Sequence, residues 1–337
     1  MKNKTMQAML LKQQNSELEF EELQIPALKS DEVLIAVECC GVCRTDLHVH
    51  DGDLKHPKLP LVLGHEVVGR IVAAPANSNL ATNQRVGVAW LANTCGVCKF
   101  CTSNRENLCD APNFTGYTVN GGYATNIVAH KDFCYPLPND ANPEEIAPLL
   151  CAGLIGWRTL KMAGDAKRIG IYGFGAAAHI IVQVAVYQGR DVYAFTKPGD
   201  KSTQEFARNL GAVWAGGSDE LPPEKLDAAL IFAPAGELIP LALKASDKGA
   251  TIVSGGIHMS DIPAFPYSIL WEERSIKSVA NLTREDAKEF FDIAFKIPIK
   301  TNVHVYDLKN ANQALADLRN GAFNGAAVLK VASGAYR

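Results

Sequence analysis

Four cysteines close together give the strongest chemical signal in this sequence. The stretch CGVCKFCTSNRENLC has the spacing C-x2-C-x2-C-x7-C, which comprises Cys95, Cys98, Cys101 and Cys109. The two short links let successive thiolates point at one centre, and the longer loop can bring the fourth thiolate back to it. Four thiolates in a closed tetrahedron are typical of a structural zinc site, which has no open position for a substrate.

Two other interpretations of this segment stay open. One is an iron–sulfur cluster, although the bacterial ferredoxin pattern ends in C-x3-C-P, whereas here the last gap is longer and Asp110 follows it. The other is a set of thiols without a metal. The chain has nine cysteines, an odd number, and a reducing cytosol would not pair them as disulfides, so zinc is favoured.

Three further residues could bind a second metal ion and leave one coordination position free. They are Cys43 in GVCRTDLH, His65 in LGHEVVG and Cys151 in LLCAG. A catalytic zinc ion takes three protein ligands and leaves the fourth position to water or substrate. These residues lie far apart in the sequence, so spacing alone does not distinguish a metal site from buried thiols and a satisfied histidine. A zinc-bound histidine needs an acceptor behind its ring, and Asp46 or Glu66 could supply one.

The stretch GFGAAA offers a binding site for a dinucleotide. Gly173, Gly175 and Ala178 form a G-x-G-x-x-A variant, which follows the apolar run RIGIY and opens a helical stretch. The first glycine permits a tight turn, and the second lets backbone N–H groups approach a pyrophosphate at the positive end of the helix. Ala178 still permits close packing of helix and strand. A lone match is weak, but the strand before it and the helix after it strengthen the prediction.

The residue that ends the next strand decides which dinucleotide fits. NAD sites place Asp or Glu there, where it accepts from the ribose hydroxyls. Here AFTKPGDK has Thr196 at that position, followed by Lys197. No carboxylate stands there to repel a 2′-phosphate, and a hydroxyl with an ammonium could bind one, so NADP(H) is favoured over NAD(H). Asp200 would reverse this preference if the loop folded back.

Two regions of the chain, which differ in sequence pattern, must position these candidate residues. Residues 6 to about 150 contain short β-like runs separated by turn signals, which predict antiparallel, barrel-like β structure. From about residue 166, strands and helices alternate with short links, which is typical of a doubly wound parallel sheet. A chain of 337 residues suits about two domains.

The composition argues against several kinds of partner. The chain is 47% apolar and 20% charged, with a formal net charge of −3, so nothing indicates nucleic acid or an anionic membrane as a partner. No apolar run approaches the roughly 18 residues that a membrane-spanning helix needs. The N-terminal stretch MKNKTMQAML lacks the apolar segment of a signal peptide. We therefore expect a cytoplasmic protein.

The order of the motifs resembles that of a known family. GVCRTDLH, GHEVVG, the four-cysteine segment, TGYTVNGGYA, LLCAG and GIYGFGAAAHIIVQVA follow one another, and the likeness covers roughly residues 6–332. The chain resembles the zinc-dependent medium-chain alcohol dehydrogenases, in particular their bacterial and yeast-like branch. The resemblance implies an α/β protein with a GroES-like catalytic domain at residues 1–152, which contains a zinc lobe at about 93–112. It also implies a Rossmann domain at 153–282 and a return segment at 283–337 that completes the catalytic domain.

The resemblance also implies what binds the second metal ion. Cys43, His65 and Cys151 would hold a catalytic zinc ion, so that each chain would bind two zinc ions. Asp46 would accept a hydrogen bond from His65. Glu66 would lie behind the metal and exchange with it as an occasional ligand.

Further roles around this metal follow from the resemblance alone. Thr45 would connect the substrate oxygen to a proton path, since a hydroxyl can donate and accept at once. His48 would exchange that proton with solvent, for which its near-neutral pKa is suited. Trp90 would form a wall of the substrate pocket and favour small or slender substrates.

One departure from the family pattern concerns the pyrophosphate. Many relatives have an arginine after a glycine near the end of the chain, where NGAAVLKV has Ala326. Arg44 can still serve, because its position in the family also faces the pyrophosphate. Arg284, just after the last predicted Rossmann strand, is another candidate.

The activity implied is the interconversion of alcohols with aldehydes or ketones by hydride transfer with NAD(P)(H). Family members often form dimers or tetramers through the last Rossmann strand, here near 275–280. A polyol dehydrogenase fits less well, because those relatives often lack the lobe zinc or use a glutamate as third ligand. A non-catalytic zinc- and nucleotide-binding protein of this fold is the alternative from another class, and a zinc hydrolase would have no use for a dinucleotide fold. The sequence specifies neither the physiological substrate nor the preferred direction.

Overall fold

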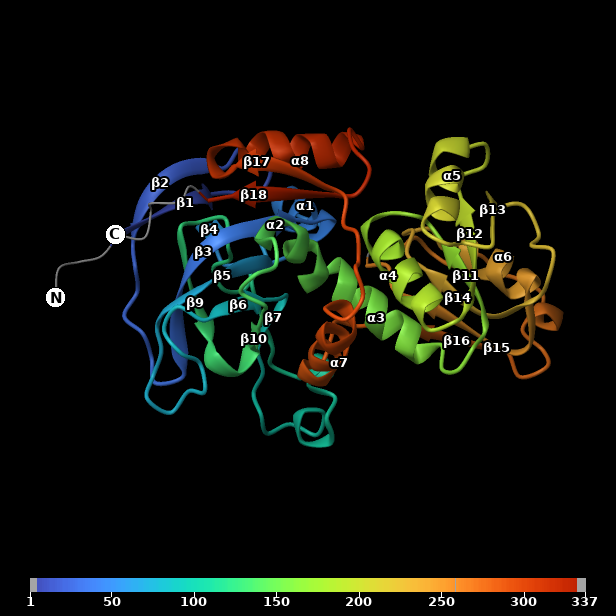
Figure 1. The fold of residues 1–337 in the computed structure, drawn as a ribbon, viewed down its shortest axis with the longest axis horizontal. Helices are drawn as coiled ribbons and strands as arrows, with labels where there is room; N and C mark the ends of the chain where they lie inside the picture. The colour runs from blue at the N-terminus through green and yellow to red at the C-terminus, as the bar shows by residue number, and fades with distance from the viewer. Residues whose placement is uncertain (1–4, 258, 332–337) are drawn as a thin grey trace. The chain divides into compact units, whose positions relative to one another are not determined.

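The chain folds into two units that differ in construction. The computed structural model describes residues 5–257 and 259–331, so the extreme ends of the predicted catalytic domain lie outside the described residues. One unit comprises the residues up to Cys151 together with those from Thr301, and the other is Ala152–Lys300. The first is rich in β structure and the second contains a parallel sheet with helices, which confirms the predicted α/β class (Figure 1).

The first unit is organised around a seven-stranded sheet with the order β10-β6-β5-β3-β18-β17, in which β9 also pairs with β3. A second sheet has the order β2-β1-β4, and β7 pairs with β8. The strands are β1 (Thr5–Leu11), β2 (Glu19–Gln24), β3 (Glu32–Val42), β4 (Leu61–Val62), β5 (Glu66–Ala73), β6 (Arg85–Val88), β7 (Leu91–Asn93), β8 (Asn113–Phe114), β9 (Asn126–His130), β10 (Cys134–Pro136), β17 (Val303–Asp307) and β18 (Ala326–Lys330). Strand β3, EVLIAVECCGV, is buried at nearly every position, because it lies in the middle of the sheet with both faces covered.

Helices of the first unit are few and short. They are α1 (Arg44–Asp51), α2 (Pro143–Ile146) and α8 (Ala311–Asn320). Helix α1 starts directly after β3 and ends at Gly52, whose φ of 88° is the left-handed conformation that glycine adopts most readily. This tight connection places the first turn of α1 at the end of the central strand.

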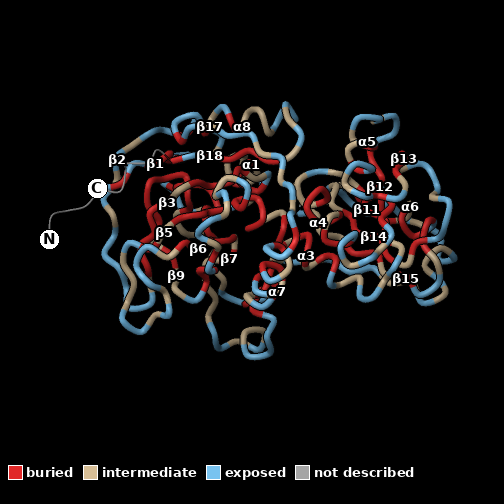
Figure 2. Tube along the Cα trace, viewed as in Figure 1, coloured by how far each residue is buried: buried red, intermediate tan, exposed pale blue. Residues whose placement is uncertain are grey.

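The second unit contains a six-stranded parallel sheet with the order β13-β12-β11-β14-β15-β16. The elements are α3 (Ala152–Met162), β11 (Arg168–Tyr172), α4 (Ala176–Tyr187), β12 (Asp191–Thr196), α5 (Lys201–Asn209), β13 (Trp214–Gly217), β14 (Leu226–Ile231), α6 (Leu238–Ala245), β15 (Ser246–Ser254), β16 (Ser275–Ser278) and α7 (Arg284–Ala294). Counted within this unit, the strand order is 3-2-1-4-5-6, which is that of the Rossmann fold. Buried residues follow the strands of each sheet, as Figure 2 shows.

The second boundary lies at residue 300 rather than at the predicted residue 282, because α7 packs on α3 within the second unit. Arg158 on α3 forms an ion pair with Asp286 on α7, and Trp157 Nε1 donates to Glu289 at 3.3 Å. Burial disfavours the charge on Asp286, but the N–H of Thr283 and the charge of Arg158 outweigh burial and hold its pKa below the usual value. The predicted boundary lies after the last strand of the Rossmann domain, because the sequence gives no signal for these contacts between α3 and α7.

No helix in the described ranges combines the length and the apolar character that crossing a membrane requires.

Candidate functional site

Four side chains from three distant segments of the first unit come together in one cluster. The ligand atoms of Cys43, His65, Glu66 and Cys151 all lie within 4.8 Å of one another. The Sγ atoms of Cys43 and Cys151 are 3.7 Å apart. The structure therefore brings together the three predicted ligands of the second metal ion, together with the carboxylate predicted to lie behind it.

The pairing of β3 with β5 explains how the first two ligands meet. Gly41 near the end of β3 is paired with Glu66 at the start of β5 in antiparallel register. Cys43 follows one strand and His65 precedes the other, so both stand at the same edge of the sheet. A Cβ atom on Gly41 would lie 1.8 Å from Glu66 Oε2, so only glycine leaves room for that carboxylate.

The donor set of this cluster fits a zinc ion. Two sulfurs and one imidazole are a ligand set of catalytic zinc sites. His65 is fully buried, and its Nε2 atom has no hydrogen-bond partner within the described part of the chain. Burial of an unpaired ring nitrogen is costly, and a metal ion would supply the missing partner. Burial also raises the pKa of Glu66 well above its usual value, and a bound cation would favour its carboxylate form.

A buried carboxylate, that of Asp46, lies behind the histidine. His65 Nδ1 lies 3.2 Å from Asp46 Oδ1, which leaves Nε2 to face a metal. The backbone N–H of Cys43 donates to Asp46 Oδ2 at 2.8 Å, and that of Gly64 donates to Oδ1 at 3.2 Å. The hydroxyl of Tyr123 also donates to Oδ2, at 3.0 Å. Sequence reasoning assigned no role to Tyr123, because a tyrosine 77 positions away gives no local signal.

The two residues of the predicted proton path both lie on α1. Thr45 Oγ1 is 3.7 Å from Cys43 Sγ, and the side chain is buried beside the cluster. His48, three residues further along the helix, is partly exposed, and its Nδ1 lies 2.7 Å from Asp53 Oδ2. Residues three apart share one face of a helix, so both side chains lie on the same side of α1. Asp53 was missed from the sequence, although it stands in the same segment.

Three stacked aromatic rings lie beside His65. Trp90 meets the imidazole edge-on, with ring centroids 5.0 Å apart. It stacks on Phe114 at 5.1 Å and on Tyr117 at 5.9 Å. The β7–β8 hairpin positions Phe114, which is paired with Leu91 just after Trp90. The sequence pointed to Trp90 alone, because the other two rings join it only through this pairing.

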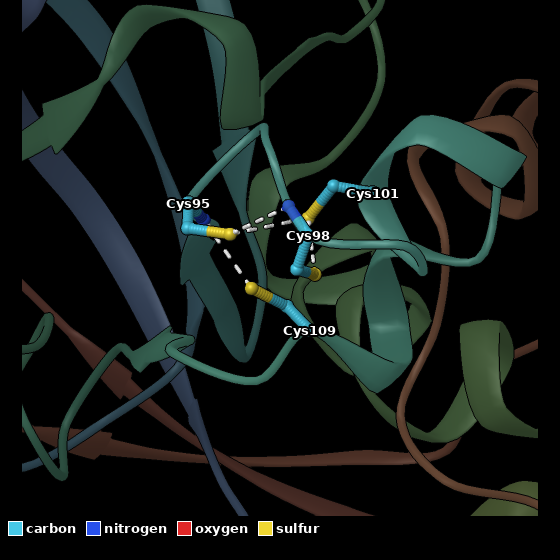
Figure 3. Close-up of side chains that lie close together, drawn as sticks. All are labelled: Cys95, Cys98, Cys101 and Cys109. Atoms are coloured by element: carbon cyan, nitrogen blue, oxygen red, sulfur yellow. Dashed lines mark hydrogen bonds between the residues drawn. The ribbon is translucent and has the colours of Figure 1, made fainter.

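The four cysteines of the lobe form a second cluster with sulfurs within 4.8 Å of one another. Figure 3 shows the four side chains pointing toward one centre. Cys98 Sγ and Cys101 Sγ are 3.6 Å apart, and Cys95 Sγ and Cys101 Sγ are 3.9 Å apart. Four sulfurs this close together are compatible with the four-thiolate zinc site that the spacing predicts, and the bound metal stays a prediction.

Backbone N–H groups surround the lobe sulfurs. The N–H groups of Cys101 and Asp110 lower the pKa of Cys98 to about 6, and those of Val97 and Cys98 lower the pKa of Cys95. Burial raises the pKa of Cys101 to about 11. Donors that stabilise thiolates favour metal binding, since the thiolate is the ligand.

The glycine-rich turn of the second unit has the geometry that a pyrophosphate needs. Gly173 follows β11 with a φ of 84°, and a Cβ atom there would lie 2.6 Å from Ala233 Cβ. Gly175 is the residue before α4, and a Cβ atom there would meet nothing within 4 Å. Ala178 is fully buried in the first turn of the helix. The predicted turn, open approach and close packing are therefore all present at these three positions.

The last residue of β12 is turned inward, and the residue after it is exposed. Thr196 is buried, accepts from Gln204 Nε2 at 3.2 Å, and lies within donating distance of the carbonyl oxygens of Lys197 and Gly216. Its hydroxyl is thus engaged inside the unit, whereas the Lys197 side chain is exposed. Asp200 accepts from the N–H of Thr203 at 3.0 Å and caps α5.

The two arginines that could contact the pyrophosphate of the cofactor are each the first residue of a helix. Arg44 is the exposed first residue of α1 in the first unit, and Arg284 is the partly buried first residue of α7 in the second. Ala326, at the position where the family pattern has an arginine, is the buried first residue of β18. The roles of both arginines stay predictions.

Comparison with known proteins places this geometry in context. The family model described as "Alcohol dehydrogenase GroES-like domain" matches residues 29–139. The chain is 43% identical over 317 residues to the "Probable alcohol dehydrogenase AdhA" of Mycobacterium tuberculosis, and the match covers 91% of each chain. The acetophenone reductase of Geotrichum candidum, solved in complex with NAD, has a TM-score of 0.86 at 26% identity over 97% of both chains. The protein named CAD from Helicobacter pylori, solved with NADP(H), has a TM-score of 0.87 at 22% identity, covers 97% of this chain and 98% of its own, and shows the fold alone.

Proposed function

Because the chain belongs to the zinc-dependent medium-chain alcohol dehydrogenase family, we propose how its residues divide the work of that reaction. The protein is an oxidoreductase that interconverts alcohols with aldehydes or ketones by hydride transfer with NAD(P)(H). None of the comparisons supports the non-catalytic alternative. The observation that carries the proposal is the convergence of Cys43, His65 and Cys151 around one centre.

We propose that these three residues hold a catalytic zinc ion and that the four lobe cysteines hold a structural one, so that each chain binds two. The unpaired Nε2 of His65 and the two neighbouring sulfurs support the first site, and the closed set of four sulfurs supports the second. When bound at the first site, zinc supplies Lewis-acid stabilisation of negative charge on the substrate oxygen. Asp46 keeps the imidazole of His65 in one orientation.

The residues of α1 handle the proton that accompanies hydride transfer. Thr45 accepts the proton of the alcohol hydroxyl and donates its own onward, because a hydroxyl does both at once. His48 exchanges the proton with solvent at the partly exposed face of the helix. Asp53 accepts from Nδ1 of His48, which favours the tautomer that leaves the other ring nitrogen for exchange. Reduction of an aldehyde runs the same path in reverse.

The substrates are small alcohols and aldehydes, and we propose that the ring stack selects slender ones. Trp90, Phe114 and Tyr117 stack nearly parallel, with interplanar angles of 20° and 10° between Trp90 and its two neighbours. The Phe114 and Tyr117 centroids are also only 6.3 Å apart, so each ring packs against the other two and turns less readily to admit a branched group. The stack lies against His65, beside the proposed metal.

For the cofactor we propose NADP(H), held through Lys197. The side chain of Lys197 is exposed, so its ammonium can reach a phosphate at this loop. The carboxylate of Asp200 is engaged in capping α5, which also supports a phosphate here. Thr196 contributes less than its sequence position indicates, because its hydroxyl is engaged with Gln204. The solved relatives bind either dinucleotide, so they favour neither.

Lys197→Ala should raise KM for NADPH about 10-fold and leave KM for NADH unchanged, as expected for loss of one charged hydrogen bond. Initial rates with both dinucleotides and a panel of aldehydes measure this. Lys248→Ala, which removes another exposed lysine of the same unit, is the matched control and should change neither value. A wild-type enzyme that prefers NADH, or an unchanged KM for NADPH in the variant, contradicts the proposal.

We also propose that the chain assembles into a homodimer or homotetramer through β16. This strand pairs with β15 on one side, and its other side has no paired strand among the described residues. Tyr267 and Trp271, which precede it, are 65% and 60% exposed. An open strand edge beside exposed aromatic rings favours pairing with a second copy.

Sedimentation equilibrium should give at least twice the mass of one chain. Ile276→Glu on β16 should reduce this to the mass of one chain, because it places a charge on the open edge. Val213→Glu, which charges another exposed apolar position of the same unit, should leave the assembly intact. A wild-type protein of single-chain mass would disprove the proposal.

A cytoplasmic location is also proposed. All nine cysteines are free in the structure, and six of them belong to the two clusters. Such thiolate sites persist where disulfides are kept reduced, as in the cytosol.

A further inference from the structure

We propose that Tyr123 is a positioning residue of the catalytic metal site, which acts through Asp46 on His65. The inference rests on the proposed metal site and deepens it, because it assigns a function to a side chain outside the proposed ligand set. Its basis is the hydrogen bond that the Tyr123 hydroxyl donates to Asp46 Oδ2 at 3.0 Å.

The carboxylate of Asp46 has a full set of hydrogen-bond donors. Oδ1 lies 3.2 Å from both His65 Nδ1 and the N–H of Gly64, and Oδ2 accepts from the N–H of Cys43 and from Tyr123. A carboxylate offers about four lone-pair sites, so four donors occupy all of them and leave it no freedom to rotate. Three of these donors belong to the two segments that carry metal ligands. Tyr123 alone comes from a third segment and ties the carboxylate to it.

Tyr123 itself is held firmly. Its N–H donates to the carbonyl of Leu63 at 2.9 Å, and its own carbonyl accepts from the N–H of Met9 at 2.8 Å. The side chain is fully buried. Gly64 has a φ of 95°, and a Cβ atom there would lie 2.3 Å from Tyr123 Cδ1, so glycine at this position makes room for the ring. The hydroxyl is therefore in place before any metal binds, which is how supporting residues preorganise a site.

A tyrosine hydroxyl, with an ordinary pKa of about 10, is protonated at neutral pH and can donate. Burial, together with the negative charge of Asp46, raises the pKa of Tyr123 well above its usual value. Without this donor, Oδ2 would keep the N–H of Cys43 as its partner and the carboxylate could turn. His65 would then be oriented less strictly, and a metal ion would be held less firmly.

Tyr123→Phe removes the hydroxyl and keeps the ring. The enzyme is loaded with Co²⁺ at the catalytic site, and its visible ligand-field spectrum and the rate of metal release to a chelator are measured. We expect the metal ion to leave the Cys43 cluster about 10-fold faster. This is the lower end of the roughly 10- to 100-fold losses that follow when a residue hydrogen-bonded to a metal ligand is changed. We also expect displaced ligand-field bands, while the lobe metal is retained as in the wild type. A purely structural role for the hydroxyl would lower the unfolding temperature without changing the spectrum.

The matched control is Tyr306→Phe. The Tyr306 hydroxyl donates to Asp317 Oδ2 at 2.9 Å in the same unit, and neither residue belongs to either cysteine cluster. This variant should keep the wild-type spectrum and release rate. In an Asp46→Asn background, Tyr123→Phe should add little to the release rate, because the group through which it acts is already altered.

Wild-type spectrum and release rate in Tyr123→Phe, or an effect of the same size in Tyr306→Phe, would overturn the inference. Full additivity with Asp46→Asn would also overturn it. These results differ from a failure of the proposed function, in which the wild-type protein itself would hold no metal at Cys43, His65 and Cys151.

Discussion

Cys43→Ser will abolish alcohol oxidation and leave the folded protein and its lobe metal intact. Cys43 Sγ lies 3.7 Å from Cys151 Sγ, on the wall of the proposed catalytic site. A serine hydroxyl is not ionised at neutral pH, so it replaces a thiolate ligand poorly. Loss of Lewis-acid stabilisation worth several kcal/mol lowers kcat/KM by about 10³-fold or more. Initial rates with NADPH or NADH across a panel of primary alcohols and aldehydes measure the loss.

The matched control is Cys134→Ser. Cys134 is buried in the same unit, its thiol donates to the carbonyl of His130 at 3.4 Å, and it belongs to neither cluster. We expect nearly wild-type activity from this variant. Metal analysis should give two zinc ions per chain in the control and one in Cys43→Ser. Undiminished activity in Cys43→Ser would show that the reaction does not depend on this cluster.

Cys109→Ser will release the lobe metal and destabilise the protein while sparing the catalytic cluster. Cys109 Sγ accepts from the N–H groups of Cys95 and Ala111 at 3.3 and 3.4 Å, and its side chain is buried. Structural zinc contributes directly to folding free energy. A loss of about 2–3 kcal/mol would lower the Tm by roughly 5–10 °C for a unit of this size. Calorimetry measures the shift, and limited proteolysis should cleave the variant first within the lobe, at about 93–112.

The two cysteine variants should separate stability from chemistry. At low temperature, Cys109→Ser should retain a large part of the wild-type rate per folded molecule, whereas Cys43→Ser should not. Both should contain one zinc ion per chain. A Cys109→Ser variant with the wild-type zinc content and Tm would contradict the assignment of a metal to the lobe.

The lobe and the nucleotide turn were predictable because their chemistry is local. Four cysteines within fifteen residues define the lobe site, and G-x-G-x-x-A between a strand and a helix defines the turn. The catalytic cluster is different, since Cys43, His65 and Cys151 become neighbours only through the β3–β5 register and the return of the chain before α3. The residues alone left that site open, and only the resemblance connected the three.

Site residues whose roles depend on tertiary packing could not be predicted from the sequence. Tyr123 reaches Asp46 across 77 positions, and Phe114 reaches Trp90 through a two-strand pairing. The hydroxyl of Thr196 marks the end of β12 in the sequence, but the structure engages it with Gln204 on the following helix. The later domain boundary has the same origin, because contacts between α3 and α7 carry no signature in either segment.

Anomalous scattering at the zinc edge, from crystals grown with zinc, tests the central claim most directly. We predict two peaks per chain, one enclosed by the four lobe sulfurs and one within bonding distance of Cys43 Sγ, His65 Nε2 and Cys151 Sγ. The catalytic account would be contradicted by a lobe peak alone, with the other three side chains in place and no density among them.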